Sequence, residues 1–318
     1  MKMPFQCVLI LLFCLSKSLN AHDSFNDRPI IGVVTEEINS TIVPKAKNYV
    51  LASYVKFLEA AGARVVPIWI YKSRDYYEEI LSKINGVLFP GGADLLTTKG
   101  YGRTGKIIFD ISTKMNDKGD YFPLWGTCLG FELLNYLAVN KLWMKACDAD
   151  DVPSNIEFVK GYKDSRMFQD LDSSLENKMK SQNVVVHYHE WCLTPKNFTL
   201  SGLDKYFKVL ALNQDARNMT FVSIIEAYNY PFYGVTFHPE KVLFEWIIFK
   251  SRKHIPHDSD SIRVSQYFAN FFVDEARKND HHFSNKKEED GALIYNYDPV
   301  YTGKYENNPN EQTYYFTQ

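Results

Sequence analysis

Tyr121-Phe-Pro-Leu-Trp-Gly-Thr-Cys-Leu-Gly130 leads from a short apolar run, past two glycines and a cysteine, into an apolar helical segment that continues through Leu137. This order predicts a strand, a tight turn at Cys128 and a helix. Glycines beside such a turn remove side chains that would clash with its strained backbone, and a helix N-terminus favours a thiolate. The turn would lie at the carboxyl edge of a sheet, where ligands of open α/β folds bind. Cys128 is therefore a candidate nucleophile; the alternative is a small buried cysteine packed at a helix start.

Strand-like and helix-like segments alternate on both sides of this turn. Near-continuous apolar runs predict buried strands, and apolar residues at helical spacing predict helices between them. The expected fold class is α/β, a three-layer sandwich with a central, mostly parallel sheet and additional strands in the second half. No Pro-, Gly- or Ser-rich linker divides the chain, so a single domain is expected over residues 26–318. The expected strands are 29–35, 64–70, 86–90, 121–125, 183–189, 207–212, 221–228 and 233–237, and the expected helices are 49–61, 75–84, 104–116 and 261–278.

The bulk composition is that of an ordinary globular protein. The 318 residues are 45% hydrophobic and 23% charged, which excludes a largely disordered or collagen-like chain. There are 36 Lys and Arg against 38 Asp and Glu, a formal charge of -2. No strong field therefore favours nucleic acid or an anionic membrane surface as a partner.

The N-terminus has the pattern of a signal peptide. Lys2 precedes the apolar run Cys7-Val-Leu-Ile-Leu-Leu-Phe-Cys-Leu15, which is far shorter than the roughly 20 residues that span a bilayer. Small residues follow, so residues 1–21 are expected to be a signal peptide, cleaved after Ser18 or Ala21. No later segment is long and apolar enough to be a membrane anchor, so export is expected. The alternative is a buried N-terminal strand or helix.

Sequons and cysteines bear on this route. Three glycosylation sequons agree with export and predict exposed loops. They begin at Asn39, Asn197 and Asn218. Loss of the signal segment leaves Cys128, Cys147 and Cys192, an odd number that gives at least one free thiol and excludes a disulfide-stapled scaffold. Whether Cys147 pairs with Cys192 stays open.

A second motif, Phe237-His-Pro-Glu240, follows the last expected strand. Pro239 favours an extended backbone at His238, and in an extended segment residues two apart face the same side. Glu240 is thus expected beside His238, where a carboxylate can orient one imidazole nitrogen while the other faces a thiol. A lone histidine at a strand end is commonly structural, but in combination with the Cys128 turn it indicates a catalytic set.

The Cys128 turn and the His238-Pro-Glu240 motif together resemble the Cys-His-Glu set of class I glutamine amidotransferase-like hydrolases. Within that group the chain is most similar to the gamma-glutamyl hydrolase family, peptidases that cleave folylpolyglutamates in lysosomes and secretions. The similarity covers nearly the whole chain after the signal segment and is weakest around residues 144–155. The matching stretches are residues 52–67, 85–92, 125–132, 196–199, 271–278 and 301–303.

The resemblance implies a role for each residue of the site. Cys128 would attack the γ-glutamyl carbonyl to give a thioester, His238 would move the proton to the leaving amine, and Glu240 would orient His238. The oxyanion hole would be formed by the backbone amides of Gly92, Ala93 and Leu129. The family also implies a homodimer, a small-molecule folylpolyglutamate substrate, no cofactor, and a secreted or lysosomal location.

Two further residues, Glu132 and His189, are expected to bind substrate. Glu132 lies just past the cysteine turn and would contact the substrate amine, although it could equally stabilise only the start of its helix. His189 corresponds to a family histidine near the cleft. It shares a strand face with His187, which suggests a metal pair, but no third ligand is evident and no metal is expected. His281 and His282 follow the last expected helix and are expected to be solvated capping residues.

Two alternatives to a peptidase stay open, a glutaminase subunit of an amidotransferase and a folate-binding relative without catalysis. The export signal argues against the first, and the intact Cys128, His238 and Glu240 argue against the second. An ordinary thiol has a pKa of about 8.5, so catalysis by Cys128 in an acidic compartment needs either a lowered thiol pKa or proton removal by His238 during attack. We expect a thiolate–imidazolium pair of Cys128 and His238.

Overall fold

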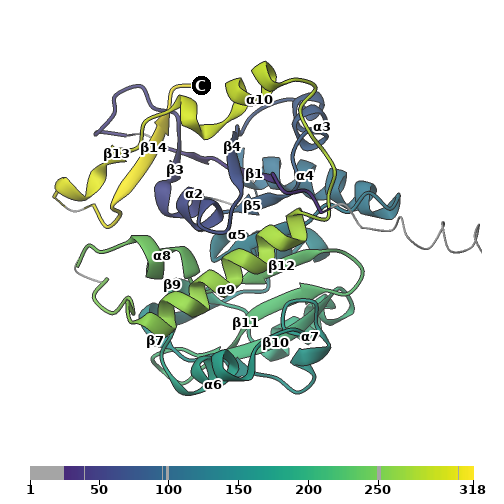
Figure 1. Cartoon of the computed structure of the whole chain (residues 1–318). Coiled ribbons are helices and arrows are strands. Elements are labelled where there is room, and N and C mark those ends of the chain that lie inside the picture. The colour runs from purple at the N-terminus through teal and green to yellow at the C-terminus, as the bar shows by residue number, and fades with distance from the viewer. Residues whose placement is uncertain (1–24, 39, 95, 98–99, 249–251, 307) are drawn as a thin grey trace, which may run out of the picture.

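A sheet of eight strands forms the centre of the computed structural model, which describes residues 25–318 apart from 39, 95, 98–99, 249–251 and 307 (Figure 1). In spatial order the first five strands are parallel and the last three are antiparallel to their neighbours. The order is β4 (Arg64–Ile68), β1 (Ile30–Val34), β5 (Val87–Phe89), β6 (Leu124–Thr127), β12 (Phe232–Val235), β11 (Thr220–Ala227), β10 (Phe207–Gln214) and β8 (Glu157–Phe158). The predicted α/β class is confirmed. The predicted signal peptide, residues 1–21, lies outside the described residues.

Helices cover both faces of this sheet, which gives the predicted three-layer sandwich. Successive strand residues point to opposite faces, so Ile31 and Val33 enter one core while Ile30 and Val34 enter the other. The first face is covered by α2 (Ala52–Glu59), α6 (Ser173–Ser181), α8 (Pro239–Phe244) and α9 (Ser259–Ala276), and Figure 1 shows α9 running across it. The second face is covered by α3 (Arg74–Leu81), α4 (Gly100–Asp117), α5 (Leu129–Val139) and α7 (Pro195–Ser201). None of the described helices is long and apolar enough to cross a membrane.

Two smaller sheets hold the main differences from the expected elements. Residues 48–51 form β3 instead of the start of a helix, because they pair with the C-terminal strand β14. The predicted strand over residues 183–189 exists as β9, but it pairs with β7 in a two-stranded ribbon outside the central sheet. The ribbon consists of β7 (Lys145–Ser154) and β9 (Val185–Cys192). The other sheet has the order β13 (Val300–Tyr301), β14 (Gln312–Phe316), β3 (Asn48–Leu51) and β2 (Glu36–Glu37), and α10 (Lys286–Ala292) precedes it in the chain.

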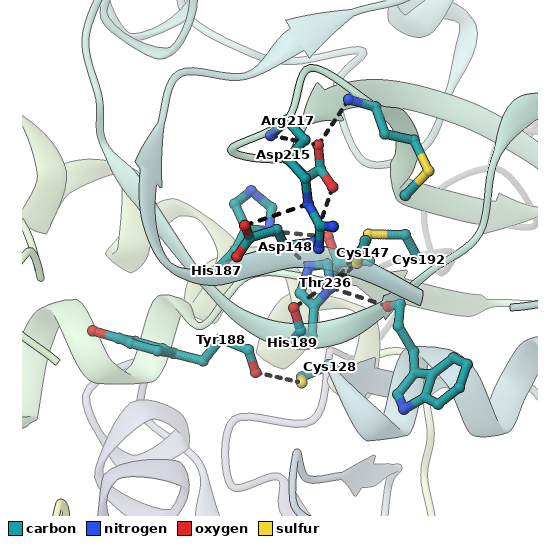
Figure 2. Close-up of a disulfide and its surroundings, with 12 residues drawn as sticks. Cys128, Cys147, Asp148, His187, Tyr188, His189, Cys192, Asp215, Arg217 and Thr236 are labelled. Atoms are coloured by element: carbon teal, nitrogen blue, oxygen red, sulfur yellow. Dashed lines mark hydrogen bonds and ion pairs between the residues drawn. A yellow bond between two sulfur atoms is a disulfide. The ribbon is translucent and has the colours of Figure 1, made fainter. Parts of the chain in front are cut away.

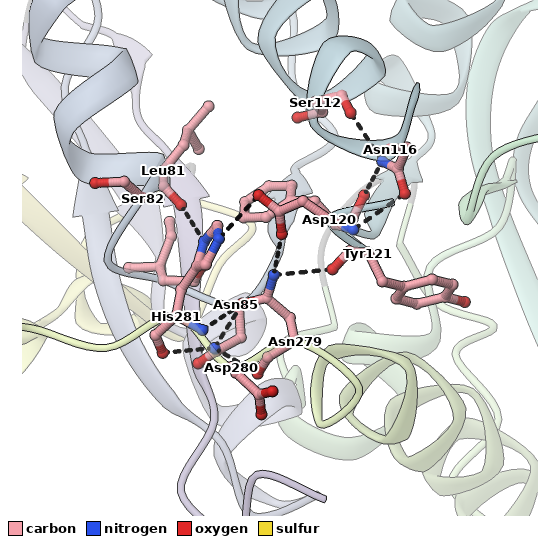
Figure 3. Close-up of polar contacts among 12 residues, drawn as sticks. Leu81, Ser82, Asn85, Ser112, Asn116, Asp120, Tyr121, Asn279, Asp280 and His281 are labelled. Atoms are coloured by element: carbon pink, nitrogen blue, oxygen red, sulfur yellow. Dashed lines mark hydrogen bonds and ion pairs between the residues drawn. The ribbon is translucent and has the colours of Figure 1, made fainter. Parts of the chain in front are cut away.

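A buried polar network fastens the end of α9 to the start of the sheet (Figure 3). The side-chain oxygen of Asn85 accepts from the amide of Ile30 (2.8 Å), and its nitrogen donates to the carbonyls of Asn279 (3.0 Å) and His281 (2.9 Å). His281 also contacts the carbonyl of Leu81 (2.8 Å) through Nδ1. The prediction of a solvated residue is therefore wrong for His281, because its ring closes this network, whereas His282 is exposed.

Candidate active site

Cys128 stands on the predicted turn between β6 and α5. Its φ of 52° and ψ of -106° are unusual for a residue with a side chain, and its amide donates to the carbonyl of Val235 (2.8 Å). A Cβ atom at Gly126 would lie 2.4 Å from the carbonyl oxygen of Gly130, and one at Gly130 would lie 2.1 Å from that of Phe89. Both flanking glycines are thus required by close backbone approach, as the sequence predicted.

His238 and Glu240 form a buried pair next to this turn. Nδ1 of His238 lies 2.7 Å from Oε1 of Glu240, and the two side chains are 5% and 0% exposed. The predicted contact exists, but the predicted geometry is wrong. His238 is the N-cap of α8 and Glu240 lies in its first turn, so a helix start and not an extended segment places them together. Because Nδ1 donates to the carboxylate, Nε2 is the nitrogen that can accept a proton.

Gly91 shows how the thiol and the imidazole are related in space. A Cβ atom built there would lie 2.9 Å from Cβ of Cys128 and 2.9 Å from Cε1 of His238. The two side chains therefore converge on one point above β5. Nε2 of His238 is buried and has no hydrogen-bond partner among the described residues, so it is available to the thiol or to a substrate.

Burial dominates the protonation of this pair. Burial, with the charges of Glu132 and Glu240, raises the pKa of the Cys128 thiol, although the Leu129 amide hydrogen bond acts in the opposite direction. Burial also lowers the pKa of His238, and the contact with Glu240 only partly offsets this. Both shifts run against the expected thiolate–imidazolium resting pair, which stays a prediction. The structure favours a neutral thiol beside a neutral imidazole.

The three amides predicted for the oxyanion hole are engaged differently. The amide of Leu129 hydrogen-bonds to the Cys128 thiol, and the amide of Ala93 donates to the carboxyl of Glu36. The amide of Gly92 has no hydrogen-bond partner within the described part of the chain.

A cavity of about 610 Å³ opens in front of Cys128. Glu132 lines it, and burial raises the pKa of Glu132 to about 8, so its carboxyl is protonated at acidic and neutral pH and can donate a hydrogen bond. Tyr188 and the exposed Trp191 come from β9 and form the wall next to the sulfur. The acidic residues on the lining are Asp94, Glu132, Asp150 and Glu190.

His189 lies on the same wall, but both of its ring nitrogens are occupied. Nδ1 lies 3.0 Å from the carbonyl of Trp191 and must donate to it, which leaves Nε2 to accept from Nδ1 of His187 at 3.2 Å. Burial lowers the pKa of His189 to about 4, so the ring is neutral. The two histidines do share one face of β9, as predicted, and they bind each other.

A disulfide between Cys147 and Cys192 settles the pairing that the sequence left open (Figure 2). Both sulfurs lie 3.7 Å from Nδ1 of His189, and this trio is the described group with atoms close enough for a metal ion. Since the two sulfurs are bonded to each other, they are not thiolate ligands in this structure. Cys128 is the free cysteine of the described residues, and its sulfur lies 3.8 Å from the carbonyl oxygen of Tyr188.

The sequons are placed in different settings. Asn197 lies in α7, and its side-chain nitrogen donates to the carbonyl of Trp143 (2.8 Å), so the predicted exposed loop is wrong there. Asn218 is exposed in the turn between β10 and β11, with a φ of 63° that asparagine tolerates. Asn39 lies outside the described residues.

Three residues near the site were missed by sequence reasoning. Tyr54 fits the inward face of an amphipathic helix, Glu36 follows a strand, and Tyr188 lies between two histidines, so none of them stands out locally. Only the resemblance over residues 52–67 gave a hint of Tyr54.

Comparison with known proteins places the chain in a family. The Peptidase C26 family profile matches residues 29–240, which include Cys128, His238 and Glu240. The gamma-glutamyl hydrolase of Rattus norvegicus is 43% identical over 93% of this chain and 94% of its own length, and that of Homo sapiens is 42% identical over the same shares. Gamma-glutamyl hydrolase B of Dictyostelium discoideum is 35% identical over 93% of this chain and 86% of its own.

Among solved structures, a glutamine amidotransferase from Thermotoga maritima aligns with 78% of this chain and 98% of its own, at 10% identity and a TM-score of 0.42. The assignment rests on the sequence relatives and the family profile, which agree over the core of the sheet and the site. The chain therefore belongs to the Peptidase C26 family, together with these gamma-glutamyl hydrolases.

Proposed function

We propose that this protein is a cysteine hydrolase that cleaves γ-glutamyl peptide bonds of folyl- and antifolyl-poly-γ-glutamates. The observation that carries the proposal is the convergence of Cys128 and His238 around Gly91, with Cys128 lining a cavity, in a chain that is 43% identical to a gamma-glutamyl hydrolase over 93% of its length. A cysteine at a strained turn and a histidine held by a carboxylate are the parts that acyl transfer requires.

The reaction follows from the neutral resting pair. Sγ of Cys128 attacks the γ-carbonyl carbon while its proton passes to Nε2 of His238, and the carbonyl oxygen becomes an oxyanion held by backbone amides. Glu240 stabilises the imidazolium that forms at this moment. Collapse breaks the carbon–nitrogen bond, and the leaving α-amine takes the proton from His238. Water then attacks the thioester, giving its proton to His238, and the thiol is released with that proton.

The substrate's negative charges need a basic partner, since the acidic residues on the cavity lining other than the protonated Glu132 would repel them. Arg252 is our candidate, because Cζ of its guanidinium lies 5.1 Å from the centroid of the ring of Tyr188, which lines the cavity. The protonated Glu132 would bind the substrate next to the sulfur. His189 would shape the wall through the ribbon and not by a hydrogen bond of its own.

We also propose the setting in which the enzyme works. Residues 1–21 would be removed on export, after Ser18 or Ala21, and residues 26–318 would form one domain in a secreted or lysosomal glycoprotein. Asn218 is the better glycan acceptor, because the side chain of Asn197 is engaged. A homodimer is proposed from the family resemblance.

Product analysis by mass spectrometry on a defined pteroylpentaglutamate tests the function. Wild type should release glutamate or short γ-glutamyl peptides at acidic pH, and Cys128→Ala should release none while still binding the substrate. Free glutamine serves as the comparison substrate, since a glutaminase subunit would prefer it. Absence of any γ-glutamyl cleavage by wild type, or residual activity of Cys128→Ala within about tenfold, would contradict the proposal.

A further inference from the structure

The segment that follows β5, residues 90–93, is held by three buried side chains from three different elements. Oη of Tyr101 in α4 donates to the carbonyl of Pro90 (2.7 Å), and Oη of Tyr54 in α2 accepts from the amide of Gly91 (2.8 Å). The carboxyl of Glu36 in β2 accepts from the amide of Ala93. The three side chains that hold the segment are Tyr101, Tyr54 and Glu36, which are 0%, 1% and 2% exposed.

The packing around the two glycines is as tight as the hydrogen bonding. A Cβ atom at Gly92 would lie 1.5 Å from Oε2 of Glu36, and one at Gly91 would lie 2.8 Å from Oη of Tyr54. The side chains of Glu36 and Tyr54 thus pack directly against the backbone of Gly92 and Gly91, next to Cys128. Oη of Tyr54 also lies 3.4 Å from Nδ1 of His238, so one phenol contacts both the segment and the histidine.

These contacts single out one amide. Pro90 has no amide proton, Gly91 donates to Tyr54, and Ala93 donates to Glu36. Gly92 lines the cavity beside Cys128, and its amide is the one in residues 90–93 that is free to donate a hydrogen bond to a ligand. The amide of Leu129, which hydrogen-bonds to the resting thiol, would become a second donor once it leaves the sulfur for the developing oxyanion.

We propose that Tyr54 and Glu36 are positioning residues that hold the Gly92 amide in place as an oxyanion donor. The inference rests on the proposed acyl-transfer function, but it concerns two residues that do not touch the reacting atoms. Without either anchor the segment gains freedom, and a donor displaced by about 1 Å loses roughly a hundredfold in rate. Substitution of a nearby buried residue that makes no hydrogen bond to residues 90–93 should leave the rate unchanged.

Tyr54→Phe and Glu36→Ala test the proposal, with Glu36→Gln as the conservative variant. Tyr77→Phe is the matched control, because the Tyr77 hydroxyl is also buried and bonds to Trp69 (2.9 Å) and Thr104 (2.8 Å), away from the segment. Three rates are measured for each variant. They are polyglutamate cleavage, hydrolysis of p-nitrophenyl acetate, and alkylation of Cys128 by iodoacetamide, which forms no oxyanion.

Tyr54→Phe and Glu36→Ala should lower kcat by about 10- to 100-fold on both substrates, with KM and the alkylation rate nearly unchanged. Glu36→Gln should recover most of kcat, because an amide oxygen still accepts from Ala93. Tyr77→Phe should lose stability but keep its rates. A wild-type ester hydrolysis rate in Tyr54→Phe, or a parallel fall in alkylation, would overturn the inference. Ester hydrolysis without polyglutamate cleavage in wild type would instead refute the proposed function alone.

Discussion

The protonation of single side chains sets how the reaction must start. Burial raises the pKa of the thiol and lowers the pKa of the histidine, and both shifts disfavour a preformed ion pair. The histidine is then ready as a base at acidic pH, because it stays neutral below the range in which an ordinary histidine protonates. Proton transfer from Cys128 to His238 therefore accompanies the attack, and Glu240 has its greatest effect after the proton has moved.

Alkylation of Cys128 by iodoacetamide should show this directly. Because burial raises the pKa of the thiol, its rate should rise about tenfold per pH unit from pH 5 to pH 8 and reach no plateau there. His238→Ala should leave the shape of that profile unchanged. Mass spectrometry gives the site of labelling, with Cys128→Ala as the unlabelled control. A plateau at low pH that disappears in His238→Ala would restore the ion-pair mechanism.

Among the elements, the β7–β9 ribbon depends on its disulfide. The Cys147–Cys192 bond closes a loop of 45 residues and joins β7 to β9, the strand whose Tyr188 carbonyl faces the reactive sulfur (Figure 2). Loop closure of this length is worth about 4 kcal/mol in the chain-entropy account. The double variant Cys147→Ser/Cys192→Ser should therefore unfold at a clearly lower temperature.

Calorimetry with and without dithiothreitol checks this prediction. The reductant should lower the unfolding temperature of wild type toward that of the double variant, and should leave the double variant unchanged. Cys128→Ala is the control, since it keeps the disulfide and lacks the free thiol. Equal unfolding temperatures for wild type and the double variant would show that the bond adds no stability.

Sequence patterns predicted the elements whose cause is local. The apolar runs of β1, β4, β5 and β6 and the helical spacing of α9 were sufficient, and so were the glycines at the Cys128 turn. The strand β3 was missed, because it exists through pairing with β2 and with β14, which lies more than 250 residues later. Pairing over such a distance leaves no local period.

In the site, as in the fold, only the residues that belong to local sequence motifs were predictable. Cys128, His238 and Glu240 lie in short motifs, whereas Glu36 and Tyr54 reach the site only through the packing of β2 and α2 against the segment after β5. The ionisation states were not predictable, because they depend on the depth of burial and not on the motif.

For the whole molecule, buried carboxyls link folding to pH. Burial raises the pKa of Glu36 from its ordinary 4.5 to about 8, and the charge of Asp94 adds to this shift. The hydrogen bonds of Glu36 to Tyr49 and Ala93, and the charge of Lys241, act in the opposite direction. A carboxyl with a raised pKa binds its proton more tightly when folded. Its contribution to stability is fully present below pH 4.5 and is lost as the pH rises toward 8.

Comparison of wild type with Glu36→Gln isolates this effect from other titrating groups. The variant keeps a neutral side chain at every pH, so its free energy of unfolding relative to wild type should increase by on the order of 1 kcal/mol per pH unit between about pH 5 and pH 8. Above pH 8 the difference should level off, because Glu36 is then ionised in both states. Urea unfolding at several pH values measures the difference. Glu288→Gln is the control, since Lys83 lowers the pKa of that half-buried carboxyl and the difference from wild type should not increase over this range. A constant difference between wild type and Glu36→Gln from pH 5 to pH 8 would mean that Glu36 is ionised throughout, and that its bond to the Ala93 amide is made by a carboxylate.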